Sequence, residues 1–374
     1  AAAQTDGIPI AVAADGRHFA TIGRSHRGEL WQFDPLQMLR VLDGEPPRAL
    51  GFSADAQRLA TASADGVIRV VDVGSGATIW QHAAKTEPAL YVELDHRGRR
   101  LAAALSGSIA QVWAVHDGKS LLRVPRDEAR AQALSPSDGG FAVGKDGVVQ
   151  LWDLDSGALR WTSPLPLAAG VPARVSALAF SADGRRVLAA AQQREAFVLD
   201  AGDGRVLHRL DEPASIQFSV GSFSPDGQQI ALGDAAKSSL LWRPQDERVL
   251  QLGGHTAALR AVSFSADSAL LASSGFDGEI KIWDTQAGEL LESFSAHDGG
   301  VLRGNARFSI DGRYLLSGGS DGAARLWAMA AEARADEILT RLLRCRAPWT
   351  LKGVTLRPDT PRCAADATPV PAEP

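Results

Sequence analysis

The residues that most invite a chemical interpretation are His255, Ser273 and Asp277, followed by Trp283. A serine activated by a histidine, itself oriented by an aspartate, is the arrangement that nucleophilic hydrolases use. The same residue types recur in the same order, with the histidine two residues further away, as His297, Ser317, Asp321 and Trp327. Fold elements repeat along a chain and active sites rarely do, so we interpret both sets as structural and expect no catalytic residue.

The elements that position these residues belong to an internal repeat. The clearest copies are "FSADAQRLATASADGVIRVVD" from Phe52, "FSADSALLASSGFDGEIKIWD" from Phe264 and "FSIDGRYLLSGGSDGAARLW" from Phe308, and degenerate copies fill the gaps. Within a copy, short runs of period two alternate with glycine turns, which predicts four strands for each unit of about forty residues. Each unit has an aromatic or aliphatic residue at the closing position of its repeat pattern, namely Phe33, Val71, Trp113, Trp152, Leu199, Trp242, Trp283 and Trp327.

The repeats resemble WD40 repeats, whose marks are Gly-His, an Asp in a hairpin turn and then Trp-Asp. The resemblance implies an all-β propeller, with eight blades preferred and seven possible, over residues 1–328. It also implies that His255, Ser273, Asp277 and Trp283 hydrogen-bond in series as a structural tetrad, and that the second set does the same. Buried imidazole and indole groups without partners would each cost about 1–3 kcal/mol, which gives these side chains a purely structural purpose.

Residues 329–374 are expected to form a separate C-terminal part. The segment 328–344 has helical periodicity and ends before Pro348, and "WTLKGVTLRP" at 349–358 has strand-turn-strand character suited to closing the ring. The last residues are expected to be disordered. Cys345 and Cys363 lie here, and a reduced pair and a disulfide both fit the sequence.

Composition excludes several classes of function. The net charge of −5 is mild, so binding to nucleic acid is not expected, and no apolar run approaches the roughly 20 residues of a membrane span. No metal-ligand spacing, Walker motif or hydrolase elbow is present, so neither a metal nor a cofactor is predicted. Of the 39 basic residues only six are lysines, and this arginine-rich, alanine-rich composition suggests a bacterial coding sequence.

A second resemblance favours an alternative. "LWDLDSGALRWTSPL" (151–165) and "VDVGSGATIW" (71–80) are similar to the Asp-x-x-Thr/Ser-Gly-x-x-x-Trp repeats of quinoprotein-type propellers. That family includes dehydrogenases that use pyrroloquinoline quinone and non-catalytic assembly scaffolds. The enzymes also need calcium ligands and an aspartate base, which we cannot place in this sequence.

Resemblance to WD40 propellers implies that a partner binds on one rim, near the start of each innermost strand and beside the turn Asp. Counting back from the repeat positions selects Arg48, Arg130, Arg174 and Arg260, together with Lys145 and Phe276 before turn Asp residues. Arginine forks suit carboxylates and phosphates, so we predict a rim that binds an acidic or phosphorylated protein segment. The predicted role is a cytoplasmic interaction or sensor module of a larger bacterial signalling protein. The alternative is a periplasmic or extracellular propeller that acts alone as a scaffold or, less favoured, as a quinoprotein-type enzyme.

Overall fold

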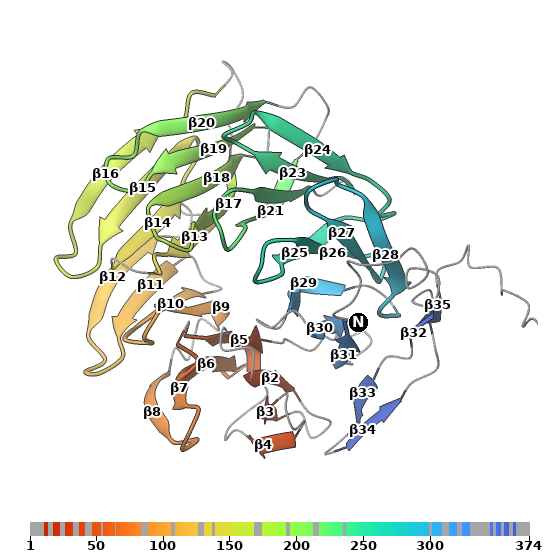
Figure 1. The fold of residues 1–374 in the computed structure, drawn as a ribbon. Helices are drawn as coiled ribbons and strands as arrows, with labels where there is room; N and C mark the ends of the chain where they lie inside the picture. Colours follow the sequence, from red (N-terminus) through yellow and green to blue (C-terminus); the bar gives the residue numbers. More distant parts are fainter. Residues whose placement is uncertain are drawn as a thin grey trace, which may run out of the picture.

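The computed structural model consists of β-sheets that succeed one another along the chain and stand in a ring (Figure 1). It describes the chain from residue 11 to residue 363 with internal gaps. Outside the described residues lie 1–10, 14–17, 23–26, 33–36, 42–46, 54, 64, 84–88, 106–108, 126–130, 137–138, 168–173, 192–194, 212–216, 235–236, 299–300, 309–313, 320–323, 330–344, 347–348, 353–354, 359–361 and 364–374.

Seven antiparallel sheets have four strands each, and we number them in chain order. Sheet 1 has β1 (Ala11–Val12), β2 (His18–Ile22), β3 (Gly28–Gln32) and β4 (Gln37–Val41), and sheet 2 has β5 (Pro47–Phe52), β6 (Arg58–Ser63), β7 (Val67–Asp72) and β8 (Thr78–Ala83). Sheet 3 has β9 (Ala89–Leu94), β10 (Arg100–Leu105), β11 (Ile109–Ala114) and β12 (Ser120–Pro125), and sheet 4 has β13 (Ala131–Leu134), β14 (Gly140–Gly144), β15 (Val148–Asp153) and β16 (Leu159–Pro164). Sheet 5 has β17 (Val175–Phe180), β18 (Arg186–Ala191), β19 (Glu195–Asp200) and β20 (Val206–Asp211). Sheet 6 has β21 (Phe218–Phe223), β22 (Ile230–Asp234), β23 (Ser239–Arg243) and β24 (Arg248–Leu252), and sheet 7 has β25 (Leu259–Phe264), β26 (Leu270–Gly275), β27 (Glu279–Asp284) and β28 (Leu290–Ser295).

The last sheet is different, because it has five strands in the order β29, β30, β31, β33, β34. Its repeat supplies β29 (Val301–Phe308), β30 (Tyr314–Gly319) and β31 (Ala324–Ala328), and the C-terminal segment supplies β33 (Trp349–Lys352) and β34 (Thr355–Pro358). The preference for eight blades is therefore wrong and the alternative of seven holds, because the described residues form seven regular four-stranded blades and the last sheet is irregular. The physical reason lies after β31, where the sequence has no glycine or proline from residue 328 to residue 347, whereas in every other sheet the segment between the third and fourth strands contains one or the other.

The C-terminal strands confirm one prediction and leave another outside the described residues. The strand-turn-strand character of 349–358 is confirmed, and β33 pairs with β31 through Arg325 and Thr350. The described residues contain no helix, and the helix predicted over 328–344 falls almost entirely on residues that are not described. The ring closes because β1 lies beside both β29 and β5, the inner strands of its two neighbouring sheets.

The core consists of apolar layers between neighbouring sheets. One cluster joins Val70 of sheet 2 to Leu101 of sheet 3, and another joins Leu151 of sheet 4 to Phe197 of sheet 5. Because both faces of these second strands are covered, the strands are buried at every position after the first instead of alternating between buried and exposed. The outermost strands are exposed on alternate residues, as β16 shows. The apolar residues of these clusters hold one sheet against the next.

In the first repeat, the closing position predicted from the sequence is wrong by two residues. Trp31 pairs with Phe19 as Trp283 pairs with Leu271, so Trp31 holds the closing position that we assigned to Phe33. Trp31 is buried and stacks on the Phe19 ring at 5.9 Å between centroids. The register is decided by packing against the neighbouring strand, and the spacing of the repeats contains no information on that packing.

Candidate functional site

The tetrad of sheet 7 forms as predicted. The Trp283 indole N–H donates to Ser273 Oγ at 2.9 Å, and His255 contacts Ser273 Oγ through Nε2 at 2.9 Å and Asp277 Oδ2 through Nδ1 at 2.9 Å. The carboxylate can only accept, so Nδ1 carries the proton and the Ser273 hydroxyl donates to Nε2. Burial raises the pKa of Asp277, but the hydrogen bonds that the carboxylate accepts from His255 and from two backbone N–H groups outweigh it, and the pKa falls to about 2.

The same geometry excludes the catalytic interpretation of this trio. Ser273 has no exposed surface, and its oxygen already accepts from the indole of Trp283. A nucleophile must face the bond that it attacks, and here the hydroxyl faces only its structural partners. The arrangement therefore joins β26 and β27, the turn between them and the loop before β25.

The last sheet contains a different version of the network. His297 Nε2 contacts Ser317 Oγ at 2.8 Å and Trp327 donates to the same oxygen at 2.9 Å, as expected. However, His297 Nδ1 contacts a guanidinium nitrogen of the buried Arg325 at 2.6 Å. A guanidinium only donates, so Nδ1 accepts and the proton lies on Nε2, the reverse of His255. Asp321, the fourth predicted member, lies outside the described residues.

A group with metal-ligand chemistry lies beside the first tetrad. Ligand atoms of His255, Asp277 and Glu279 all lie within 4.8 Å of one another, the one such group found among the described residues. The His255 ring is hydrogen-bonded to the Asp277 carboxylate, and Glu279 Oε2 contacts Lys281 Nζ at 2.7 Å. These contacts already use the donor atoms, so we assign the group to the ion-pair network of sheet 7.

The predicted rim residues whose backbone the structure describes lie at one end of the sheets. Neighbouring strands are antiparallel, so the start of each innermost strand and the turn between the second and third strands emerge at the same end, here called the upper rim. At this rim the guanidinium of Arg260 stacks on the Phe276 ring, 3.6 Å from its centroid. Phe276 is 43% exposed and Arg260 is half-buried, so the pair presents an aromatic ring and a cation to solvent.

The structure brings a second pair of rim residues together. The exposed Arg174 forms a backbone bridge with Asp146, and the Val175 N–H donates to the Lys145 carbonyl at 3.4 Å. Arg174 at the start of sheet 5 is therefore adjacent to Lys145 in the turn of sheet 4. Arg48 lies on β5, with its side chain outside the described part of the chain, and Arg130 is not described. The grouping of all six residues around one mouth stays a prediction.

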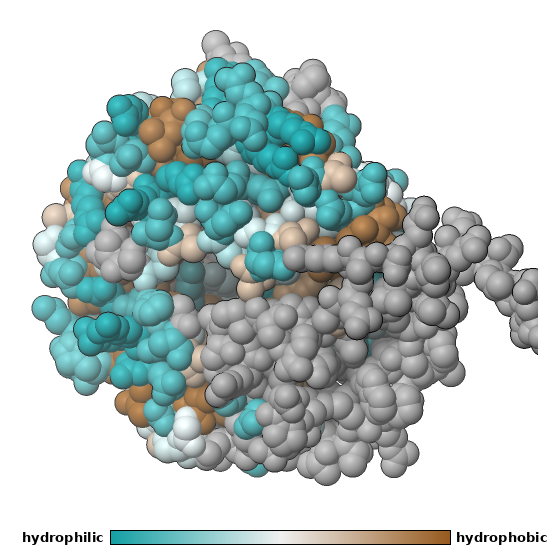
Figure 2. Space-filling model, in the orientation of Figure 1, coloured by the Kyte–Doolittle hydropathy of each residue, from teal (hydrophilic) through white to brown (hydrophobic). Residues whose placement is uncertain are grey.

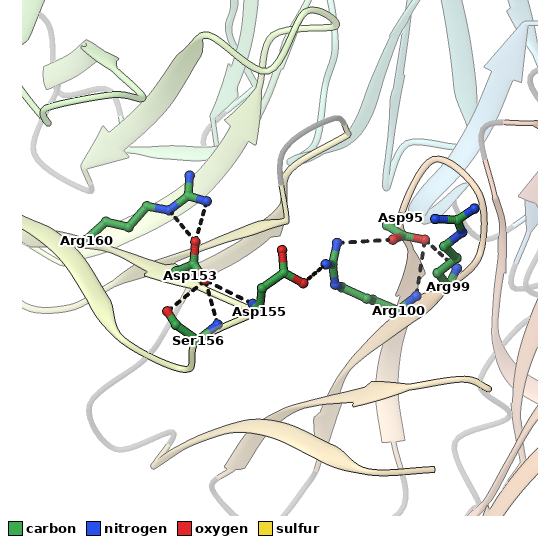
Figure 3. Close-up of polar contacts among 7 residues, drawn as sticks. All are labelled: Asp95, Arg99, Arg100, Asp153, Asp155, Ser156 and Arg160. Atoms are coloured by element: carbon green, nitrogen blue, oxygen red, sulfur yellow. Dashed lines mark hydrogen bonds and ion pairs between the residues drawn. The ribbon is translucent and has the colours of Figure 1, made fainter. Parts of the chain in front are cut away.

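Sequence reasoning missed the polar contacts that join sheets at the opposite rim, where Arg100 bridges Asp95 of its own sheet 3 and Asp155 of sheet 4 (Figure 3). In the same turn Asp153 accepts from the Ser156 N–H at 2.7 Å and from the Arg160 guanidinium at 2.6 Å. The Ser156 backbone N–H, followed by Arg160, holds the pKa of Asp153 well below its usual range. The Asp-x-x-Ser-Gly motif marks this turn, but nothing local shows that Asp155 meets an arginine 55 residues earlier.

Sequence reasoning also did not single out Glu93 and Tyr91 on the innermost strand of sheet 3. Glu93 accepts a hydrogen bond from the Leu134 N–H of sheet 4 at 3.1 Å, and Tyr91 is 45% exposed. The available signal was a glutamate at a repeat position where most other copies have glycine, alanine or serine.

Sheets of four strands in a ring, tied by a buried His, Ser, Asp and Trp network, define a β-propeller of the repeat type. Comparison with known families agrees. The family model "WD domain, G-beta repeat" matches residues 36–72, 246–284 and 288–328. The family model "Outer membrane protein assembly factor BamB" matches residues 64–233. Three segments of the chain thus match the WD40-repeat model, and most of the stretch between the first two of them matches the model of the second family.

Relatives among characterised proteins are distant. Autophagy-related protein 16 of Arabidopsis thaliana is 26% identical over 161 residues, which cover 43% of this chain and 31% of that protein. Angio-associated migratory cell protein of Homo sapiens is 21% identical over 303 residues, which cover 75% of this chain and 68% of that protein. The transcriptional corepressor LEUNIG_HOMOLOG of Arabidopsis thaliana is 21% identical, covering 72% and 34%. The chain thus spans about a third of the first and third of these relatives.

Solved structures show the same fold. The C-terminal WD40 domain of Sif2 superposes with a TM-score of 0.73 at 15% identity, covering 86% of this chain and 95% of that chain. The computationally designed Ika8 protein superposes with a TM-score of 0.70 at 22% identity, covering 85% and 95%. Within the described residues, no helix is both long and apolar enough to cross a membrane.

Proposed function

We propose that the chain is a non-catalytic protein-interaction module that binds an acidic or phosphorylated segment of a partner on its upper rim. The observation that carries this proposal is the stacked pair of Arg260 and Phe276. WD40 propellers are typical protein-interaction scaffolds, and relatives named above include a transcriptional corepressor. The fold is therefore consistent with a binding role, and the chemistry of the rim suggests the kind of partner.

Stacking prepares Arg260 for recognition of an anion. The ring of Phe276 supports one face of the guanidinium and restricts its motion, and the planar guanidinium group is of the kind that matches carboxylate or phosphate oxygens. The exposed Phe276 ring adds apolar area next to the charge, as interaction hot spots commonly do. Arg174, exposed and adjacent to Lys145, provides a second cationic point on the same rim.

We test the proposal with a peptide array of acidic, phosphoserine-containing and neutral peptides of equal length. We expect capture of acidic or phosphorylated peptides, lost in the double variant Arg260→Glu with Arg174→Glu at an unchanged melting temperature. Arg248→Glu is the matched control, because Arg248 is equally charged and exposed but lies on the outermost strand of sheet 6. Peptide capture that survives both charge reversals would show that Arg260 and Arg174 are not the binding site. Loss of capture in Arg248→Glu as well would show the same.

The cellular setting that we propose is the recognition or sensor part of a larger cytoplasmic signalling protein, bacterial by composition. A second candidate is an extracytoplasmic assembly scaffold. It is favoured by the match of residues 64–233 to the assembly-factor model and by the pairing of Cys345 opposite Cys363 between β32 (Cys345–Arg346) and β35 (Arg362–Cys363). The intact mass of the native protein distinguishes the two: a chain of this size with oxidised cysteines supports the scaffold, and a much larger reduced chain supports the signalling protein.

A further inference from the structure

The C-terminal segment folds as a pair of short strands around a hairpin. The inner hairpin consists of β33 and β34. Outside it β32 pairs with β35, with Cys345 directly opposite Cys363 and Arg346 opposite Arg362. The chain has these two cysteines and no other. They therefore stand together at the base of a loop, residues 346–362, that contains the inner hairpin.

This loop supplies the strand that extends the last sheet beyond its own repeat. β33 pairs with β31 through Arg325 opposite Thr350 and Leu326 opposite Trp349. In sheet 7 the third and fourth strands pair at every position from Glu279 to Trp283. The attachment of β33 to its sheet is therefore short by comparison with a regular blade.

The chain that leads to β33 is also long. In sheet 7 the third strand ends at Asp284 and the fourth begins at Leu290, whereas β31 ends at Ala328 and β33 begins at Trp349. A longer loop costs more conformational entropy to close, and the short pairing of β33 offers few backbone hydrogen bonds to offset that cost. β33 therefore gains more from a further restraint than the fourth strand of sheet 7 does.

The outer pair lies against a different blade from the inner hairpin. β35 contacts β28, the outermost strand of sheet 7, whereas β33 and β34 belong to the last sheet (Figure 1). Leu290 at the start of β28 is 47% exposed, and Figure 2 shows hydrophobic surface over this strand. The segment thus has its base on sheet 7 and its inner hairpin on the last sheet.

The backbone geometry suits a covalent bond at this base. Residues directly opposite each other in an antiparallel pair have Cα atoms about 4.5 or 5.5 Å apart. A disulfide spans Cα separations of about 4.4–6.8 Å. β32 and β35 pair at only two positions, and so short a pair of strands is marginally stable through its hydrogen bonds alone. A disulfide would hold together strands that are otherwise weakly held.

We propose that Cys345 and Cys363 form a redox clasp: their disulfide keeps β33 on the last sheet, and its reduction allows β33 and β34 to leave β31. The disulfide restricts the conformations open to the detached segment, so detachment gains less entropy. For a loop of this length the restriction shifts the equilibrium between attached and detached forms by about a hundredfold. The clasp is independent of the partner proposed for the upper rim.

Thiol–disulfide exchange supplies the chemistry. The thiolate of one cysteine attacks glutathione disulfide and releases one glutathione, and the second cysteine thiolate then displaces the other glutathione. The two cysteine thiols lose two electrons and two protons, which glutathione disulfide takes up as it becomes two thiols. A dithiol such as dithiothreitol reverses the step, because it reduces the protein disulfide and becomes a cyclic disulfide itself.

Release of β33 changes the environment of β31 most directly. The backbone groups of β31 that face Thr350 and Trp349 lose their partners, and β31 becomes the edge strand of its sheet. Backbone amides that open locally exchange their hydrogens faster, in proportion to the population of the open form. The amides of β31 and β33 are therefore the reporters of the clasp.

Hydrogen exchange of the full chain, read by mass spectrometry, tests the proposal. One sample is oxidised with glutathione disulfide and the other is reduced with dithiothreitol, at the same pH and temperature. We expect peptides that cover 324–328 and 349–352 to exchange at least roughly tenfold faster after reduction. A peptide that covers β19 in sheet 5 should exchange equally in both samples, and equal acceleration there would mean general loosening and overturn the proposal.

Cysteine variants decide the assignment. The double variant Cys345→Ser with Cys363→Ser should exchange in β31 and β33 as fast as the reduced wild type, with or without dithiothreitol. Either single variant should do the same, because one cysteine cannot form the bond. Equal exchange of β31 in the oxidised and reduced wild type, or slow exchange in the double variant, overturns the proposal. An oxidised product that is a dimer or a glutathione adduct, instead of a chain lighter by two hydrogens, equally overturns it.

Discussion

Replacement of Asp277 by asparagine tests whether the tetrad of sheet 7 stabilises the fold through its charge. The side chain is 5% exposed and accepts from the His255 ring and from the Thr256 N–H at 2.8 Å. Its pKa of about 2, against 3.8 for an ordinary aspartate, means that the fold favours the ionised form over the protonated form by about 2 kcal/mol. Asparagine resembles the protonated form in shape and charge. We therefore expect Asp277→Asn to lower the free energy of unfolding by about 2 kcal/mol at pH 7.

The pH dependence of this difference is the sharper part of the prediction. A depressed pKa stabilises the fold fully above the unfolded-state pKa and loses that effect as pH falls through the folded-state pKa. The difference between the wild type and Asp277→Asn should therefore hold from pH 7 to about pH 5 and shrink toward zero as pH approaches 2. Urea unfolding at a series of pH values measures it.

Asp246→Asn is the matched control, because Asp246 is exposed and its carboxylate takes part in no hydrogen bond described for this chain. It should change the free energy of unfolding by less than about 0.5 kcal/mol at every pH. A penalty for Asp277→Asn that is the same at pH 3 as at pH 7 would refute the reasoning, since it would have to arise from shape or hydrogen bonding and not from charge.

Two further predictions concern the turns and the C-terminal segment. Gly204 has φ +76°, and an added Cβ would lie 2.6 Å from the Trp161 ring, so Gly204→Ala should destabilise by about 2 kcal/mol or more in urea unfolding. Gly253→Ala, with nothing within 4 Å of its Cβ position, should be nearly neutral, and equal effects would contradict this account. Backbone register places Cys345 opposite Cys363, at a spacing that suits a disulfide, so the non-reduced intact mass should be two hydrogens below the reduced mass. Identical masses would mean that the pair stays reduced.

Much of the fold was predictable because its signals are local and periodic. The alternation of short apolar runs with glycine turns predicted four-stranded units, and the paired spacing of His255, Ser273, Asp277 and Trp283 predicted a tetrad that the structure confirms. The hairpin at 349–358 was likewise visible from its turn and flanking residues. Each of these features depends on residues within one repeat, whose geometry the chain sets locally.

The errors occurred where the local pattern is weak. In the first repeat the spacing alone selected Phe33, and only the packing of Trp31 on Phe19 shows the true register. In the last repeat the absence of glycine and proline between residues 328 and 347 was overlooked, so a complete four-stranded blade was expected. The replacement of an acidic partner by Arg325 beside His297 has no local signal, because both arrangements satisfy the same histidine.

The sequence by itself determined that this is a repeat protein of small antiparallel sheets with buried polar networks, because periodicity and turn chemistry are properties of neighbouring residues. Tertiary structure alone decided which residues of different repeats meet. It placed Arg260 on Phe276, Arg100 against Asp155, β33 beside β31, and Glu93 against the backbone of Leu134 in the next sheet. Such contacts depend on the twist and closure of the whole ring, which bring together residues with no relation along the chain.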